Sequence, residues 1–262
     1  MGRQAQWPVA AADEARALPR QARIRTWRRA GAPWSRRLAT VVGDGERVLL
    51  FGPPGVGKGT QALRLGTTLR IPHISTGEIL RAAIRSNTGL GLRVRDSLAE
   101  GMLVPDESML EVVRRRLAER DAQNGYILDG FPRTVSQAED LARLLGGAPP
   151  FVDAVIVLEA PPEDLVRRLA GRRICENCQD SYHITGRPPR VTNACDRCGA
   201  SLIERADDRE ETVRFRQTEY AAKTAPVIAY FESHGWPVRM VDALGDIDQI
   251  FGRIYAAMFW HP

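Results

Sequence analysis

From residue 46 onward, short apolar runs alternate along the chain with longer amphipathic segments. Apolar runs of four or five residues bounded by Gly, Pro or Asp are typical of buried strands, whereas apolar positions three and four apart are typical of helices. We therefore predict strands at Val48–Phe51, Pro72–Ser75, Tyr126–Asp129, Ala154–Leu158 and Val238–Val241. Helices are predicted at Gly59–Arg70, Thr76–Ser86, Leu92–Glu100, Ser108–Arg120, Ser136–Leu145, Pro161–Leu169, Glu210–His234 and Ile247–Phe259. Pro105-Asp106-Glu107 is expected to start the helix Ser108–Arg120, since Pro is tolerated early in a helix.

This order of elements predicts an α/β fold. Parallel strands are joined by crossover connections, so the alternation favours a parallel five-stranded sheet flanked by helices. Ser75 or Thr76 could cap the helix that follows the second strand, and Pro226 predicts a kink in the helix Glu210–His234. The segment from Gly171 to Asp208 shows neither periodicity and is predicted to be an irregular insert.

The first strand runs into a glycine-rich loop, Gly52–Thr60, with the sequence GPPGVGKGT. Glycines let the backbone curl so that successive N–H groups face one anion, and the following helix adds the positive end of its dipole. Lys58 supplies a mobile charge, and it is one of only two lysines among 37 basic residues. Gly59 stands where the general motif has Ser or Thr. The alternative, a turn that binds nothing, is disfavoured by the strand and helix on either side.

Asp129 ends the apolar strand Tyr126–Asp129, about 70 residues after Lys58. A carboxylate there can reach the water shell of a magnesium ion held by nucleotide phosphates. Alternatively, it caps the turn before Pro132. The nearby phosphate loop favours the magnesium role.

All four cysteines lie in the insert, as two C-x2-C pairs separated by 16 residues: Cys175, Cys178, Cys195 and Cys198. Each pair can hold one side of a tetrahedral metal, and four thiolates leave no open coordination position. We therefore predict structural zinc, with two disulfides as the alternative. The intervening loop is rich in Pro, Gly and polar residues, so the metal would supply its folding energy.

Arginines gather on both sides of this insert: Arg167, Arg168, Arg172 and Arg173 before it, and Arg205, Arg209, Arg214 and Arg216 after it. Some must belong to solvated helix faces. Phosphoryl transfer, however, needs several fixed cations around a highly charged transition state. Arginines at the two hinges of a mobile lid could reach that charge only when the lid closes, and closure also excludes water.

Charge is distributed unevenly along the chain. Residues 1–45 hold nine Arg and three acids, a net charge of +6, so the formal charge of +5 leaves −1 for residues 46–262. The folded body is therefore not expected to bind nucleic acid. Residues 1–45 are predicted to be a disordered or partly helical basic extension or an over-long gene start; a basic arm for nucleic acid, lipid or a partner, or a transit peptide, is the alternative. No run has the ~20 apolar residues of a membrane span, and clustered thiols favour a reducing, cytoplasmic location.

The chain resembles adenylate kinase, in the long bacterial form whose lid carries four cysteines. The resemblance runs from Arg47 to the C-terminus. It rests on GPPGVGKGT, HISTGEILRAAI, GMLVPDE, GYILDGFPRT with Gln137, GRRICENC, ACDRCG and RADDREETVRFR. Gly59 is normal in this family. The resemblance implies a P-loop nucleoside monophosphate kinase fold with an AMP-binding flap at 75–104, a zinc-ribbon-like lid at 171–208 and a core at 46–74, 105–170 and 209–262.

The resemblance also implies the reaction ATP + AMP ⇌ 2 ADP, in a monomer that uses Mg²⁺ with ATP, and it implies site residues. The catalytic cations would be Lys58, Arg133, Arg172, Arg205 and Arg216. ATP would contact Gly55, Val56, Gly57, Lys58, Gly59, Thr60, Arg168 or Leu169, Arg172, Ser181, Tyr182 and Gly245. AMP would contact Thr76, Arg81, Met102, Leu103, Val104, Gly130, Phe131, Pro132, Arg133, Gln137, Arg205 and Arg216. Asp129 and Asp208 would organise the magnesium water shell.

Two alternatives to this function remain open. Kinases that phosphorylate UMP or CMP resemble the chain at the phosphate loop, but they usually have Ala at the position of Thr76 and a short lid without cysteines. The chain could also be a non-catalytic nucleotide- and zinc-binding module, which the intact set of cations argues against. The four histidines, His73, His183, His234 and His261, are scattered and are expected to be structural.

Overall fold

Five parallel strands form the central sheet of the computed structural model, which describes residues 45–146 and 151–259. The strand order is β2-β3-β1-β4-β8. The strands are β1 (Arg47–Phe51), β2 (His73–Ser75), β3 (Tyr126–Asp129), β4 (Ala154–Glu159) and β8 (Val238–Asp242). Leu49 at the centre of β1 is in register with Leu128 on one side and Val155 on the other. The predicted parallel five-stranded sheet is confirmed, and residues 1–44 of the predicted basic extension lie outside the described residues.

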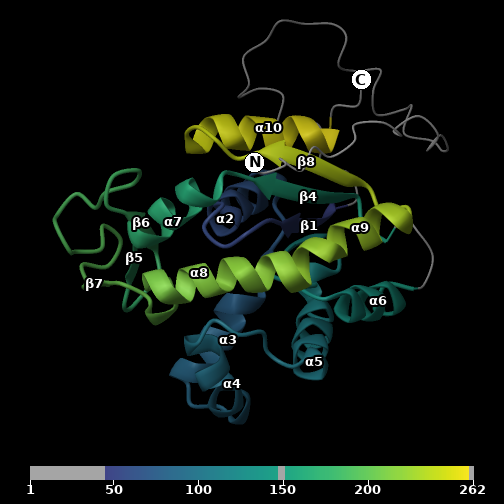
Figure 1. Ribbon diagram of the computed structural model, residues 1–262, viewed down its shortest axis with the longest axis horizontal. Coiled ribbons are helices and arrows are strands. Elements are labelled where there is room, and N and C mark those ends of the chain that lie inside the picture. The colour runs from purple at the N-terminus through teal and green to yellow at the C-terminus, as the bar shows by residue number, and fades with distance from the viewer. Residues whose placement is uncertain (1–44, 147–150, 260–262) are drawn as a thin grey trace, which may run out of the picture. The chain divides into compact units, whose positions relative to one another are not determined.

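Helices cover both faces of the sheet (Figure 1). Successive side chains of a strand point to opposite faces, and they belong in turn to two hydrophobic cores. Leu49 and Leu128 belong to one core with α3, α4, α5, α6 and α9, whereas Val48 and Ile127 belong to the other with α2, α7 and α10. The helices are α2 (Lys58–Leu69), α3 (Thr76–Arg85), α4 (Gly89–Ala99), α5 (Asp106–Leu117), α6 (Val135–Leu144), α7 (Pro162–Ala170), α8 (Glu210–Glu219), α9 (Ala225–Ser233) and α10 (Ile247–Phe259). Burial on both faces explains why the strands read as continuous apolar runs.

Side-chain caps fix where several helices begin. Ser75 caps α3, because its Oγ accepts a hydrogen bond from the backbone N–H of Glu78 at 3.4 Å. Thr88 caps α4 in the same way through the N–H of Gly91, so this helix begins three residues before the predicted Leu92. The helix predicted at Ser108–Arg120 begins at Asp106 after Pro105, as expected from Pro105-Asp106-Glu107, but it ends at Leu117, before a short 3₁₀ turn η3 (Arg120–Ala122).

The long helix predicted at Glu210–His234 contains a π-helical segment, η5 (Tyr220–Thr224), between α8 and α9. Pro226 has no N–H to donate to the preceding turn, and the N–H of Ala225 donates to Tyr220, five residues back. Figure 1 shows α9 leaving the line of α8 at this point. The predicted interruption near Pro226 is confirmed.

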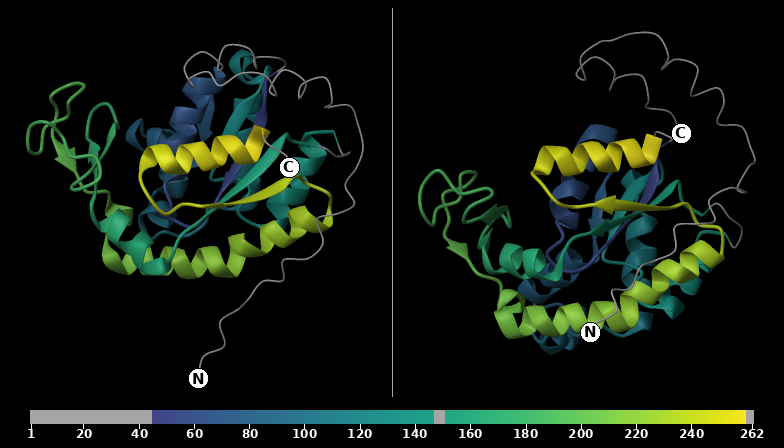
Figure 2. Two further views of the ribbon diagram at one scale, coloured as in Figure 1. Left: turned by 90° about the horizontal axis from the view of Figure 1, so that it is seen from above. Right: turned by 45° about the horizontal axis from the view of Figure 1, so that its top comes forward.

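The cysteine-bearing insert is not irregular, and that prediction was wrong. It forms a small antiparallel sheet in the order β6-β5-β7, from β5 (Arg172–Cys175), β6 (Ser181–His183) and β7 (Leu202–Ile203) (Figure 2). Its core consists of Cys175, Tyr182, Cys195 and Leu202. The cysteine turns bring the strand ends together, which a reading of local periodicity could not show. A 3₁₀ turn, η4 (Ala206–Asp208), joins the insert to α8.

None of the helices in the described part of the chain has the length and apolar character needed to cross a membrane.

Candidate active site

A cleft of ≈ 1040 Å³ lies where the carboxyl ends of the strands meet. Ligands in open α/β sheets bind at this edge, near the point where the strand order reverses. In this sheet β1 lies between β3 and β4, and the phosphate loop follows it directly. The cleft is lined by that loop, by the segments after β2, β3 and β8, and by the insert.

The phosphate loop is shaped for an anion by its glycines. Gly55 and Gly57 have φ values of 87° and 101°, which side chains rarely tolerate. A Cβ on Gly55 would lie 2.7 Å from the carbonyl oxygen of Leu165. Helix α2 begins at Lys58 without a side-chain cap, so its first N–H groups and the positive end of its dipole are available to a phosphate.

Lys58 folds back over this loop. Its Nζ donates to the carbonyl oxygens of Gly52 at 2.7 Å and Pro53 at 3.0 Å. Burial lowers the pKa of Lys58, Asp129 opposes the shift and Arg133 with other cationic neighbours adds to it, so that the pKa is about 8. The negative charge of Asp129 therefore does not fully compensate the buried ammonium, and a nucleotide phosphate would supply the missing charge.

Asp129 ends β3 beside the phosphate loop. Burial alone would raise the pKa of Asp129, but the hydrogen bond from His73 and the charge of Lys58 hold it below its usual range. His73 Nε2 lies 3.3 Å from Asp129 Oδ2. A Cβ on Gly59 would lie only 3.8 Å from the same oxygen, so the loop and this carboxylate share one corner of the cleft. His73 could not be placed here from the sequence, because it lies on another strand.

The predicted catalytic arginines converge on the cleft, where acids hold them. Arg172 Nε donates to Asp208 Oδ2 at 2.6 Å, and Arg216 Nη1 donates to Asp207 Oδ2 at 3.0 Å. Asp208 is almost completely buried and does not line the cleft; its carboxylate also lies 3.5 Å from Arg216. Its proposed contact with magnesium water stays a prediction. Burying a cation costs desolvation free energy, and the ion pairs with these acids offset part of that cost.

Two further arginines share one carboxylate. Glu78 Oε1 accepts from Arg81 Nη2 and from Arg205 Nη2, each at 2.7 Å. Burial alone would raise the pKa of Glu78, but these two cations hold it below its usual range. Burial also lowers the pKa of Arg205 to about 10. Glu78 therefore links the segment after β2 to the end of the insert, a role that the sequence did not indicate.

Arg133 is held on three sides. Its Nε donates to the carbonyl oxygen of Gly130 at 2.9 Å, its backbone N–H donates to Gln137 Oε1 at 2.8 Å, and its carbonyl oxygen accepts from Thr224 Oγ1 at 3.0 Å. Burial and the nearby Arg216 lower the pKa of Arg133 to about 10. Thr224 lies in the π-helical segment, and it was not among the predicted site residues.

Every residue predicted to contact ATP or AMP lines this cleft. Arg168 bridges two walls of it, since Nη2 donates to the carbonyl oxygen of Ala243 at 2.8 Å and Nη1 to that of Val56 at 3.4 Å. Gln217 Nε2 donates to the carbonyl oxygen of Pro54 at 2.8 Å and ties α8 to the phosphate loop. Gln217 was missed because a single Gln on a helix carries no signal in a sequence.

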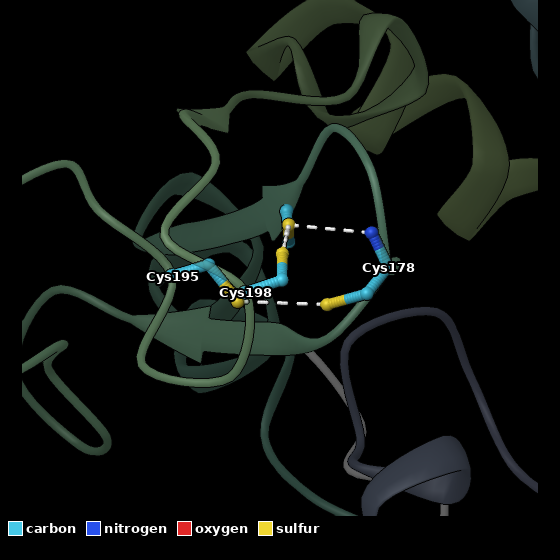
Figure 3. Close-up of side chains that lie close together, drawn as sticks. Cys178, Cys195 and Cys198 are labelled. Carbon is cyan, nitrogen blue, oxygen red and sulfur yellow. Dashed lines mark hydrogen bonds between the residues drawn. The ribbon is translucent and has the colours of Figure 1, made fainter.

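The four cysteine sulfurs lie within 4.8 Å of one another. Figure 3 shows Cys178, Cys195 and Cys198 directed toward a common centre. The Sγ atoms of Cys175 and Cys198 are 3.4 Å apart and those of Cys178 and Cys195 are 3.5 Å apart, so all four are free thiols and not the disulfides of the alternative prediction.

This cluster fits a tetrahedral metal site. Zn–S bonds of about 2.3 Å place tetrahedral sulfurs about 3.8 Å apart. The backbone N–H of Cys178 donates to Cys175 Sγ, and that of Arg197 donates to Cys195 Sγ, each at 3.4 Å. The hydrogen bond from Tyr182 and the bond from Arg197 lower the pKa of Cys195 and so favour its thiolate, the form that binds metal. Among the described residues, these four cysteines form a group that could hold a metal ion.

Comparison with known proteins identifies the family. A family model described as "Adenylate kinase" matches residues 50–236. Proteins named adenylate kinase from Geobacter sp. (strain M21) and Methanosarcina barkeri are 47% and 45% identical over 211 residues, which is 80% of this chain and 98% and 97% of theirs. One from Streptomyces coelicolor is 46% identical over 213 residues, 81% of this chain and 98% of its own. The resemblance carried by the motifs is confirmed, and the chain belongs to the adenylate kinase family.

Proposed function

We propose that this nucleoside monophosphate kinase catalyses ATP + AMP ⇌ 2 ADP by direct in-line phosphoryl transfer, with no covalent enzyme intermediate. The observation that carries the proposal is the convergence of Lys58, Arg133, Arg172, Arg205 and Arg216 on one cleft. Phosphoryl transfer needs positioning and stabilisation of charge more than it needs covalent chemistry from the protein.

In this proposal the phosphate loop and Lys58 hold the outer phosphates of ATP, and Arg168 and Gly245 line the site of its nucleoside. Thr76, Arg81 and Gln137 lie in the part of the cleft assigned to AMP. The arginines held by Glu78, Asp207 and Asp208 would exchange these carboxylates for phosphate oxygens, which offer the same bidentate geometry. The attacking group is already a phosphate anion, so no strong general base is needed.

Two metals complete the proposal. Mg²⁺ would arrive with ATP, and Asp129 would order its water shell from the end of β3. When bound, Mg²⁺ neutralises charge on the transferred phosphoryl group. Zn²⁺ would be held by the four cysteines, where it supplies no chemistry and fixes the fold of the insert.

The remaining assignments follow from this mechanism. Residues 75–104 form the AMP-binding flap, residues 171–208 form the lid, and 46–74, 105–170 and 209–262 form the core. Closure of lid and flap would exclude water, which otherwise competes as phosphoryl acceptor. We assign the protein as a monomer with ATP, AMP and ADP as its partners and neither nucleic acid nor membrane, and the reduced cysteines favour the cytoplasm.

Turnover of ATP with AMP, measured by coupled detection of ADP, tests the proposal. The wild-type protein is expected to form two ADP per AMP consumed, and Lys58→Ala is expected to lose nearly all of this activity while retaining its fold. The competing function, a non-catalytic nucleotide-binding module, predicts tight nucleotide binding without turnover in the wild-type protein.

A further inference from the structure

We propose that Asp106 selects the acceptor base by fixing the orientation of the Gln137 side-chain amide. Asp106 does not line the cleft, whereas Gln137 does. Asp106 is therefore a positioning residue that acts through Gln137. The inference rests on the proposed function, because it concerns the base of the nucleoside monophosphate in that cleft.

The amide of Gln137 is held at both ends. Its Nε2 donates to Asp106 Oδ1 at 2.6 Å, and its Oε1 accepts from the backbone N–H of Arg133 at 2.8 Å. The second carboxylate oxygen of Asp106 accepts from Thr134 Oγ1 at 2.9 Å, so the carboxylate is itself fixed. Thr134 Oγ1 in turn accepts from the backbone N–H of Gln137 at 3.1 Å and caps α6.

These partners allow only one orientation of the amide. A carboxylate can only accept a hydrogen bond, and a backbone N–H can only donate one. Rotating the Gln137 amide by half a turn would set Oε1 against Asp106 and Nε2 against the N–H of Arg133, which replaces two attractive contacts with two repulsive ones. Gln137 is 1% exposed, so water could not compensate for the lost bonds.

After these contacts, the amide still has one N–H on Nε2 and one lone pair on Oε1 for a ligand. Because the amide cannot rotate, the positions and the order of this donor and this acceptor are fixed. Adenine matches that order, because its 6-amino group donates to Oε1 while its N1 accepts from Nε2. Hypoxanthine has the same shape but presents an oxygen at position 6 and an N–H at position 1, which is the reverse order. The site therefore selects a 6-aminopurine over a 6-oxopurine. A free amide could rotate to serve either base.

Inosine monophosphate is the matched competitor, since it differs from AMP in this donor and acceptor order and adds no bulk. The test measures kcat/KM for AMP and for inosine monophosphate, with ATP and Mg²⁺ saturating, in the wild-type protein and in Asp106→Asn. The Asn amide can donate to a rotated Gln137 amide, so the backbone N–H of Arg133 is the one partner named above that still opposes rotation. We expect the ratio of kcat/KM for AMP to kcat/KM for inosine monophosphate to fall by about tenfold or more in Asp106→Asn. A hydrogen bond to a charged group is worth more than the 1.4 kcal/mol that corresponds to a factor of ten.

Three variants make the result specific. Glu107→Gln neutralises the adjacent acid of the same first turn, which is exposed, and is expected to leave the ratio unchanged. Asp106→Ala removes the acceptor and is expected to lower the ratio in the same direction but by less. In a Gln137→Leu background, which has no amide to orient, Asp106→Asn is expected to change the ratio no further.

A ratio that stays constant in both Asp106 variants, with kcat/KM for the two acceptors falling by one common factor, would mean that Asp106 supports the fold only, and would overturn the inference. A further change of the ratio in the Gln137→Leu background would overturn it as well. Absence of AMP turnover in the wild-type protein would instead refute the proposed function, so the two failures are distinct.

Discussion

The low pKa of Lys58, about 8 in place of 10.5, links activity and stability to pH in opposite directions. Its largest cause is burial, so the charged ammonium is disfavoured in the folded, nucleotide-free protein. Because ATP binding needs that charge, raising the pH through 8 should weaken the productive encounter with ATP. The same deprotonation should relieve a cost that the folded protein carries.

The size of both effects follows from the two pKa values. The difference between 10.5 and about 8 corresponds to roughly 3 kcal/mol of preference for the neutral amine. Between these values the unfolded chain binds the proton and the folded chain does not, so the Lys58 contribution to stability rises with pH across this window and is constant outside it. Below pH 8 the charged side chain costs its full amount.

The assay is the pH profile of kcat/KM for ATP between pH 7.5 and 9.5, with AMP saturating. This quantity reports the free enzyme, and we expect it to be level up to about pH 8 and then to fall tenfold per pH unit. We expect kcat to change less, because bound phosphates restore the charge on Lys58. Lys58→Met is expected to abolish turnover and to raise the Tm by several degrees, since about 2–4 °C accompanies each kcal/mol in a domain of this size.

A kcat/KM for ATP that stays level to pH 9.5 would refute the low pKa of Lys58. A Tm that falls in Lys58→Met would refute the claim that burial of this charge costs stability.

Three other predictions concern features away from Lys58. Removing bound zinc with a chelator is expected to lower the Tm and to increase proteolysis within residues 171–208 first, because the four thiols lie only there; equal melting with and without chelator would argue against structural zinc. Thr224→Val is expected to lower kcat severalfold and to cost about 1–2 kcal/mol of stability, measured by urea unfolding, through loss of the bond to Arg133; Thr224→Ser, which keeps the hydroxyl, should restore both. Deleting residues 1–45 is expected to leave kcat/KM nearly unchanged, because none of the site residues lies there; a large fall would assign that segment a role in catalysis.

Much of the fold could be predicted because it depends on patterns among residues that are close together in the sequence. The strands are buried on both faces and therefore read as apolar runs, and their alternation with helices implies a parallel sheet. The phosphate loop could be predicted as well, since its backbone shape depends on glycines such as Gly55 that stand together in the sequence. The cluster of sulfurs could be predicted from the C-x2-C spacing, because the two cysteines of each pair also stand close together in the sequence.

The parts that could not be predicted depend on contacts between distant segments. The small sheet of the insert is held together at its cysteine turns, not by apolar periodicity. His73 meets Asp129 only because β2 lies beside β3, and Glu78 meets Arg205 across 127 residues. Asp106 belongs to the GMLVPDE motif, but no role could be assigned to it from the sequence, because its contact with Gln137 exists only in the fold.

The most direct test of the proposed function is a panel of acceptors, AMP, UMP, CMP and GMP, each supplied with ATP and Mg²⁺ to the purified protein and followed by separation of the nucleotide products. The proposed function predicts that AMP gives the highest kcat/KM of the four acceptors, and that ADP is the one product of the reaction of ATP with AMP. UMP or CMP exceeding AMP would contradict it.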